Sequence, residues 1–295
     1  MRFLKVRALT TECNQTASWK NAVRGAVVAA AFMLFAGQNG ARAAELQDFI
    51  ALKYEVRLNG IPVAELHVDA AVGNHSYDIS STMWTRGLMD LILGFKSYAR
   101  AQGRIGKMPG GPVVRPESHS DDNTWMEEER RVNIVYGPKG PKNTRVSPSP
   151  ADEGRDEVSA NLRHDTQDLL SAALKLSLSA SNGTICQSRA QIFDGRRRYD
   201  LIFSPGKVED TALGSNIHCD GKLVRLAGRS SESWLPRSKV PKEFQFWVNE
   251  VDPGLPPVPY RLKAFANIGW IVVELENYSR EQRAEVIVPA DETSG

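Results

Sequence analysis

Hydrophobic and polar residues alternate with a period of two along most of the chain, as they do in strands that bury one face. Leu52, Tyr54, Val56 and Leu58 alternate with polar residues, and a second alternating run follows Asn59-Gly60. The Asn-Gly pair between the two runs predicts a hairpin. Further strands are expected at Ser76–Trp84, Ser97–Ile105, Thr124–Tyr136, Thr184–Phe193, Arg198–Phe203, Ile217–Leu226, Glu243–Val251, Tyr260–Asn267, Trp270–Leu275 and Ala284–Val288.

Short turn signals rich in Gly, Asn, Asp and Pro separate many of these runs, and few helical patterns interrupt them. The sequence therefore predicts a mainly β fold, with one large antiparallel curled sheet and one or two short helices. The curled sheet could be an open barrel or a β-spiral. The helices are expected at Asp165–Ser179, which could plug or cover the sheet, and at Thr85–Phe95.

Residues 1–43 have the composition of a secretory signal peptide. Basic residues dominate the first 24 positions, the uncharged run Gly25–Gly37 follows, and Ala41-Arg42-Ala43 supplies the small residues that a signal peptidase reads. An uncleaved membrane anchor is the alternative, but a spanning helix needs about 20 apolar residues and this run is shorter. We expect cleavage after Ala43, a periplasmic location and no transmembrane anchor in the mature chain.

Cleavage changes the charge balance. The 295 residues carry a formal net charge of +2, and removal of residues 1–43 takes away six basic residues and one acid, which leaves a mildly acidic chain. A charge this close to neutrality argues against a nucleic-acid partner. Residues 44–295 are expected to form a single β-rich domain. Within it, 137–157 is expected to be a flexible loop, and the C-terminal tail 289–295 is a candidate for disorder.

Two cysteines, Cys186 and Cys219, remain after cleavage, because Cys13 lies in the leader. Cysteines of an exported chain usually pair, so we predict a disulfide between Cys186 and Cys219. Two buried free thiols are the alternative, and a zinc site is a weaker one because the sequence has no C-x-x-C pair. We expect no metal and no other cofactor.

The segment that begins at Trp84 is the strongest candidate for binding. Leu88, Leu91, Ile92 and Phe95 recur at i, i+3, i+4 and i+7, so a helix would gather them on one face. Packing against the sheet is the simplest explanation of such a face. The functional alternatives are a lid over an apolar ligand or a surface that contacts a membrane.

Three consecutive arginines, Arg196, Arg197 and Arg198, follow the turn Asp194-Gly195. They could bind an anion such as a phosphate, a lipid headgroup or an acidic glycan. The alternative, which we favour, is a charged hairpin end that resists edge-to-edge pairing of strands.

Sequence signatures of catalysis are missing. The chain has no G-x-S-x-G elbow, no Gly-rich phosphate loop and no histidine pair at the i, i+4 spacing of a helical zinc site. The acids at Asp121-Asp122 and Glu127–Glu129 lack the ligand spacing of a calcium loop. We therefore expect no catalytic residues and favour a non-enzymatic protein.

Several sequence segments, in their order along the chain, resemble the domain-of-unknown-function 3108 family of exported bacterial proteins. These segments are Tyr54–Asp69, Ser76–Leu91, Asp165–Leu176, Ile192–Phe203 and Pro256–Leu275. In architecture the chain is also similar, more weakly, to the β-spiral envelope-integrity proteins of alphaproteobacteria. The resemblance implies a periplasmic location and an antiparallel β fold. It implies no reaction and no catalytic residues.

The leading functional hypothesis is a non-enzymatic periplasmic protein of cell-envelope maintenance that binds a lipid or another amphipathic envelope component. One alternative is a structural or interaction module that binds a partner protein or a glycan. The third is a hydrolase of envelope polymers, which would need converging acids or a Ser/His pair in a pocket.

Overall fold

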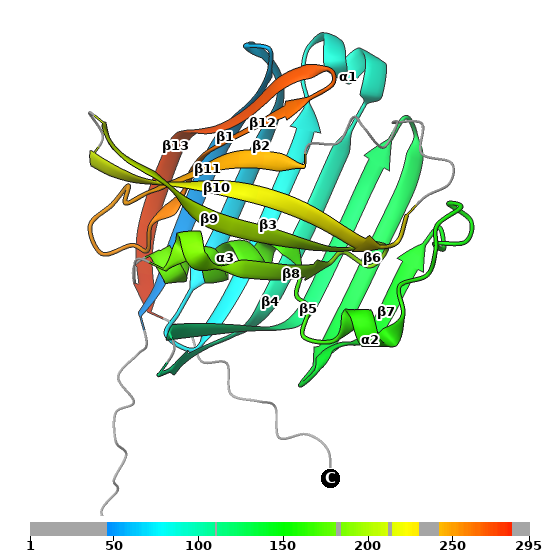
Figure 1. Ribbon diagram of the computed structural model, residues 1–295, viewed down its shortest axis with the longest axis horizontal. Coiled ribbons are helices and arrows are strands. Elements are labelled where there is room, and N and C mark those ends of the chain that lie inside the picture. Colours follow the sequence, from blue (N-terminus) through cyan, green and yellow to red (C-terminus); the bar gives the residue numbers. More distant parts are fainter. Residues whose placement is uncertain (1–45, 110, 181–183, 212–213, 230–241, 285–295) are drawn as a thin grey trace, which may run out of the picture. The chain divides into compact units, whose positions relative to one another are not determined.

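The computed structural model describes residues 46–109, 111–180, 184–211, 214–229 and 242–284, all within the compact unit Ala44–Gly295 (Figure 1). The expected leader, 1–43, and the tail, 289–295, lie outside the described residues, as does most of the strand expected at Ala284–Val288. The strands are β1 (Leu46–Leu58), β2 (Ile61–Val72), β3 (Ser76–Thr85), β4 (Lys96–Met108), β5 (Gly111–Trp125), β6 (Glu128–Gly137), β7 (Gly140–Ser147), β8 (Arg189–Phe193), β9 (Arg198–Thr211), β10 (Gly214–Ala227), β11 (Glu243–Asn249), β12 (Val258–Ala266) and β13 (Gly269–Ala284). The helices are α1 (Leu88–Leu93), α2 (Ala160–Arg163), α3 (Leu169–Ala180) and the 3-10 helix η1 (Ile185–Gln187).

The strands of the described residues form one antiparallel sheet, in the order β7-β6-β5-β4-β3-β2-β1-β13-β12-β11-β10-β9-β8. Two meanders, β1 to β7 and β8 to β13, meet where β1 pairs with β13. The predicted mainly β fold with one large antiparallel sheet is confirmed, and the hairpin at Asn59-Gly60 joins β1 to β2 as expected. The sheet is open, with β7 and β8 as its edge strands.

Helix α3 lies against the inner face of the curled sheet. It contacts β3, β4 and β5 on one side and β8 and β12 on the other, strands that are far apart in the sheet order. The helix expected at Asp165–Ser179 is thus confirmed as a plug, but it begins at Leu169. Asp168 accounts for this start, because its carboxylate accepts a hydrogen bond of 2.8 Å from the backbone N–H of Ser171.

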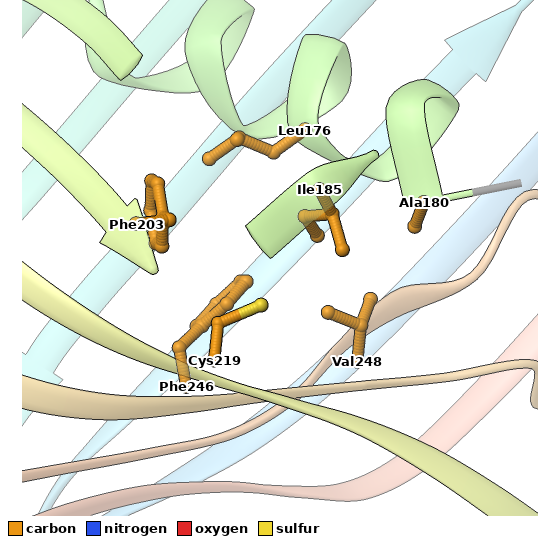
Figure 2. Packing of buried hydrophobic residues seen from close by; sticks show 7 residues of the cluster. All are labelled: Leu176, Ala180, Ile185, Phe203, Cys219, Phe246 and Val248. Carbon is orange, nitrogen blue, oxygen red and sulfur yellow. The ribbon is translucent and has the colours of Figure 1, made fainter. Parts of the chain in front are cut away.

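One core cluster packs α3 against strands of the second meander, β8 to β13. Leu176 and Ala180 point from α3 toward Phe203, Phe246 and Val248 of the strands (Figure 2). Cys219 is completely buried in this cluster and forms a disulfide with Cys186, with the two Cα atoms 5.2 Å apart. The predicted disulfide is therefore confirmed.

Interruptions in the strand ladders allow the bend around α3. One register shift falls between Gln102 and Gly103, where β4 pairs with β5. A Cβ atom at Gly103 would lie 2.2 Å from the backbone oxygen of Arg115 and 2.7 Å from the Tyr77 hydroxyl. Only glycine fits at this position.

The segment 137–157, expected as a flexible loop, contains the edge strand β7, which pairs with β6. The loop interpretation is wrong for these residues. The loop prediction rested on the small number of aliphatic side chains in this segment. An edge strand is held mainly by backbone hydrogen bonds to its neighbour, and in β7 the aliphatic side chain of Val146 packs beside Val132 of β6. In the turns that follow, the Asp152 carboxylate accepts a hydrogen bond from the Ser149 hydroxyl, and Glu153 is buried.

Two other strand predictions also differ from the structure. Residues Thr124–Tyr136 are not one strand, because Met126 and Glu127 form a two-residue turn with positive φ angles between β5 and β6. Residues Thr184–Phe193 begin with η1, so only Arg189–Phe193 is strand. A third α-helix, α2, was not expected.

Candidate functional site

Eight exposed hydrophobic side chains gather at one end of the sheet, a surface that we name the apolar rim. Consecutive turns of a meander alternate between its two ends, so the β1–β2 turn, the β3–β4 connection and the β5–β6 turn share an end. The β12–β13 turn joins them, because Leu58 at the end of β1 pairs with Ile271 near the start of β13 (Figure 1). The rim residues are Ile61, Leu88, Leu91, Ile92, Met126, Phe265, Ile268 and Trp270.

Hydrogen bonds hold the four connections side by side. Asn59 of the β1–β2 turn donates its side-chain N–H to the Ile268 carbonyl at 3.1 Å, and its side-chain oxygen accepts the N–H of Trp270 at 2.9 Å. The N–H of Arg86 binds the Val63 carbonyl at 2.8 Å. The N–H of Met126 binds the Leu93 carbonyl at 3.0 Å. The rim is therefore one continuous surface and not a set of unrelated tips.

Helix α1 carries the most exposed part of the rim, and the interpretation of its face as core packing is wrong. The exposed fractions are 85% for Leu91 and 71% for Leu88, and no residue of α1 is buried. The helix has only six residues and lies against the ends of β2 and β3, and none of its side chains is buried.

Thr85 holds α1 in this position. Its buried hydroxyl donates to the Asp90 carboxylate at 3.0 Å and accepts the N–H of Phe95 at 3.0 Å, which ties both ends of the connection together. Gly94 ends the helix in the left-handed conformation. The two aromatic candidates flank the helix: Trp84 packs edge-on against His67 at 4.7 Å, and Phe95 against Trp125 at 6.3 Å.

Sequence reasoning identified Leu88, Leu91 and Ile92 of the rim and missed the residues on the other three turns. For two of the missed residues, the sequence itself contained a signal. Ile268 stands inside the turn Asn267–Gly269, and Ile61 directly follows Asn59-Gly60, both positions where polar residues are usual. Met126 occupies a turn position with φ of 49°, a conformation that costs a non-glycine residue free energy and that is enriched at functional sites.

The three consecutive arginines form structural contacts, and the anion-site interpretation is wrong for Arg196 and Arg198. Arg196 is buried and donates to the carbonyls of Ser147 at 2.8 Å and Pro148 at 3.0 Å. Arg198 is buried and pairs with the buried Asp200 at 2.6 Å. The favoured alternative, a charged hairpin end, fits only Arg197, which is exposed and pairs with Asp194 at 2.8 Å.

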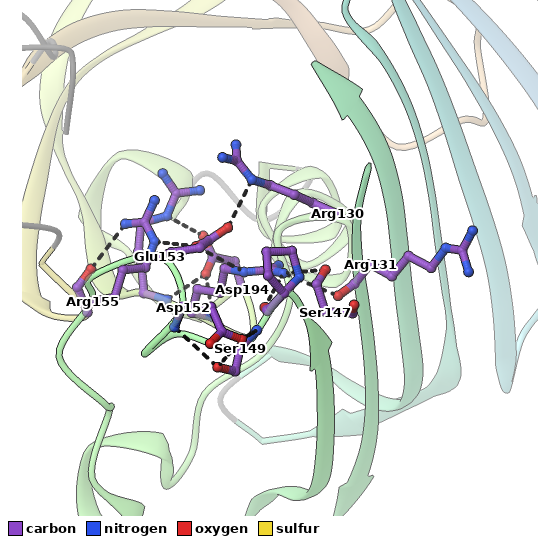
Figure 3. A network of polar contacts seen from close by, with 12 residues as sticks. Arg130, Arg131, Ser147, Ser149, Asp152, Glu153, Arg155 and Asp194 are labelled. Atoms are coloured by element: carbon purple, nitrogen blue, oxygen red, sulfur yellow. Dashed lines mark hydrogen bonds and ion pairs between the residues drawn. The ribbon is translucent and has the colours of Figure 1, made fainter. Parts of the chain in front are cut away.

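Arg196 also belongs to a buried ion network that joins the two open edges of the sheet. Its Nε lies 3.2 Å from the Glu153 carboxylate, and Glu153 lies between Arg130 and Arg155 (Figure 3). Burial lowers the pKa of Arg196, and the Glu153 charge opposes that shift. The network therefore ties the β8–β9 turn to β6 and β7.

A buried cluster of serine, histidine and aspartate has the residue types of a catalytic triad but not its connections. The Ser171 hydroxyl donates to Asp168 at 2.6 Å, whereas His119 lies 3.8 Å from Asp168 and makes no hydrogen bond to Ser171. A catalytic serine needs its histidine as the proton acceptor. The Tyr77 and Ser171 hydroxyl oxygens lie 2.7 Å apart, and because Ser171 donates its proton to Asp168, Tyr77 is the donor in this pair. Burial raises the pKa of the Tyr77 phenol. The cluster fixes the start of α3 and gives the hydrolase hypothesis no support.

A hollow of about 510 Å³ lies over β3 to β6, lined mostly by polar side chains and by none of the rim residues.

Among the described residues, the helices are too short or too polar to span a membrane. Within the same residues, no three His, Cys, Asp or Glu side chains gather so that they could hold a metal ion.

Among solved structures, the chain is similar to the beta-barrel-like protein of domain of unknown function DUF1849 from Brucella abortus, with 6% identity and a TM-score of 0.38. The match covers 80% of this chain and 98% of that chain. No family model matches the sequence, and no curated protein does. Membership of the domain-of-unknown-function 3108 family stays a prediction.

Proposed function

We propose that this chain is an exported, non-enzymatic protein of the cell envelope whose apolar rim binds an apolar or amphipathic envelope component. The observation that carries the proposal is the rim itself. Eight large hydrophobic side chains are exposed on four connections that hydrogen bonds hold together. Contiguous apolar surfaces of this kind are typical of sites that bind lipids or partners.

The disulfide supports the part of the proposal that concerns location. Disulfides persist in oxidising compartments such as the periplasm and are rare in the cytosol. The Cys186–Cys219 bond and the leader-like composition of residues 1–43 both support an exported protein. Cell fractionation should recover the protein in the periplasm with Ala44 as its first residue. Recovery in the cytosol with residues 1–43 intact would contradict an exported protein.

The binding part of the proposal predicts saturable binding of a single-chain amphiphile. Lysophosphatidylcholine, added below its critical micelle concentration, should change the tryptophan fluorescence because Trp270 lies in the rim. Replacing Leu88 and Leu91 together by asparagine should weaken binding about tenfold or more, since each leucine would lose its apolar contact.

The matched control is Met108→Asn. Met108 is 57% exposed but is the last residue of β4, at the opposite end of the sheet from the rim. Its replacement should leave lysophosphatidylcholine binding unchanged. Equal losses in both variants would show that binding is nonspecific, and no binding by the wild-type protein would contradict the proposal.

A further inference from the structure

We infer that the apolar rim docks on the surface of a phospholipid bilayer that carries anionic headgroups. This inference rests on the proposed function and makes it specific: the component that the rim binds is a membrane surface, not one lipid enclosed in a pocket.

The rim projects from the sheet and, among the described residues, does not enclose a cavity of its own. Its side chains lie on turns, on the strand ends beside them and on a six-residue helix, with exposed fractions that reach 85% at Leu91. A single lipid requires a concave site that encloses most of its surface. A fluid bilayer adapts to projecting side chains and admits them to the depth of its headgroup region. Projecting apolar residues on adjacent turns therefore fit a bilayer.

Aliphatic and amphipathic side chains lie together at this end of the sheet. Ile61, Leu88, Leu91 and Ile268 lie on α1 or in and next to the turns, with exposed fractions of 53% to 85%. Trp270 lies under the ammonium group of Lys263, 4.3 Å from the ring centroid. Tryptophan and lysine are the residues that place themselves at the boundary between acyl chains and headgroups, because one end of each is apolar and the other is polar.

The charges beside the rim complement an anionic surface. Four basic residues lie next to the tips: Arg57, Arg86, Lys96 and Lys263. Arg57 pairs with Glu55 and Glu274, and Arg86 pairs with Glu65. Neither Lys96 nor Lys263 forms an ion pair within the described ranges, so both ammonium groups can meet lipid phosphates.

The charges also indicate which side of the rim contacts the bilayer. The β5–β6 turn holds the exposed acid Glu127, which an anionic surface repels, and the exposed Glu128 and Glu129 that follow it in β6 pair with Arg130 and Arg131. The contact therefore centres on α1 and on the β1–β2 and β12–β13 turns, and Met126 lies at its margin.

Sedimentation with sucrose-loaded vesicles tests the inference. The purified exported chain should bind vesicles of phosphatidylcholine and phosphatidylglycerol in a 7:3 ratio. The variant with both Leu88→Asn and Leu91→Asn should bind at least tenfold more weakly. The variant with both Lys96→Gln and Lys263→Gln should bind about tenfold more weakly to these vesicles and about as the wild type does to pure phosphatidylcholine. Met108→Asn should bind as the wild type does.

The outcomes separate the two proposals. If vesicles do not bind but lysophosphatidylcholine monomers do, the bilayer inference is wrong and the proposed function stands. If neither binds, both are wrong. If the chain is a dimer that the Leu88 and Leu91 replacements dissociate, and it binds no vesicles, the rim is a contact between two copies and the bilayer inference is wrong. The replaced side chains are exposed, so equal thermal melting of all variants checks that each is folded.

Discussion

Replacing Cys186 and Cys219 together by alanine is expected to lower the free energy of unfolding by about 3–4 kcal/mol. The disulfide joins residues 33 positions apart. A crosslink over a loop of this length removes enough conformational freedom from the unfolded chain to account for about 3–4 kcal/mol in the chain-entropy description. Urea unfolding, followed by tryptophan fluorescence, measures the change.

A reduced wild-type sample separates the crosslink from the packing of the sulfur atoms. Cys219 is fully buried against Phe203 and Phe246, so alanine also leaves a small cavity there. Reduced wild-type protein keeps both sulfur atoms and should lose nearly as much stability as the double variant. If reduction and the double replacement each cost less than about 1 kcal/mol, the disulfide does not hold η1 against β10, and the prediction is wrong.

Replacing Glu153 by glutamine is expected to lower the free energy of unfolding by about 3 kcal/mol. The Glu153 side chain is only 7% exposed and lies 2.9 Å from Arg130, 2.6 Å from Arg155 and 3.2 Å from Arg196. Glutamine keeps the shape but removes the charge, which leaves the buried guanidinium of Arg196 without its carboxylate. Removing one member of a buried ion pair typically costs about 3–5 kcal/mol. Chemical denaturation measures the effect.

Glu129→Gln is the matched control. Glu129 pairs with Arg131 at 2.8 Å on β6, but both side chains are more than half exposed. Exposed ion pairs contribute about 0–1 kcal/mol, so this variant should unfold close to the wild-type midpoint. A similar loss in both variants would mean that general charge balance, and not the connection between the sheet edges, determines the stability.

Local patterns were sufficient for the features that depend on neighbouring residues. Alternation predicted the sheet, Asn59-Gly60 predicted its first hairpin, and the acidic start of Asp165–Ser179 predicted α3. Strand β5 lacked such a pattern, because Pro112, Pro116 and a polar run through Asn123 obscure it. Its ladder with β4 forms nonetheless, and Pro116 falls at the register shift opposite Gly103.

The candidate site depended on contacts that no local pattern contains. The apolar spacing of Leu88, Leu91 and Ile92 was visible, but whether that face is buried depends on how far α1 extends beyond the strands. Trp270 joins this end of the sheet because β1 pairs with β13, more than 200 positions away. Likewise, Arg196 looked like a free cation in the sequence, and its partner Glu153 comes from a distant turn.

The pairing of β1 with β13 also has a consequence for the order of folding. Leu46 pairs with Ala284, so the first and last described strands are neighbours in the middle of the sheet. During synthesis β1 has an exposed edge until the final strand emerges, and an exposed edge is a site for aggregation. Pairings so distant in sequence close slowly, because the entropy of a long loop is lost first. The chain therefore needs time after synthesis before it can reach its native state, and during that time the edge of β1 stays accessible to chaperones.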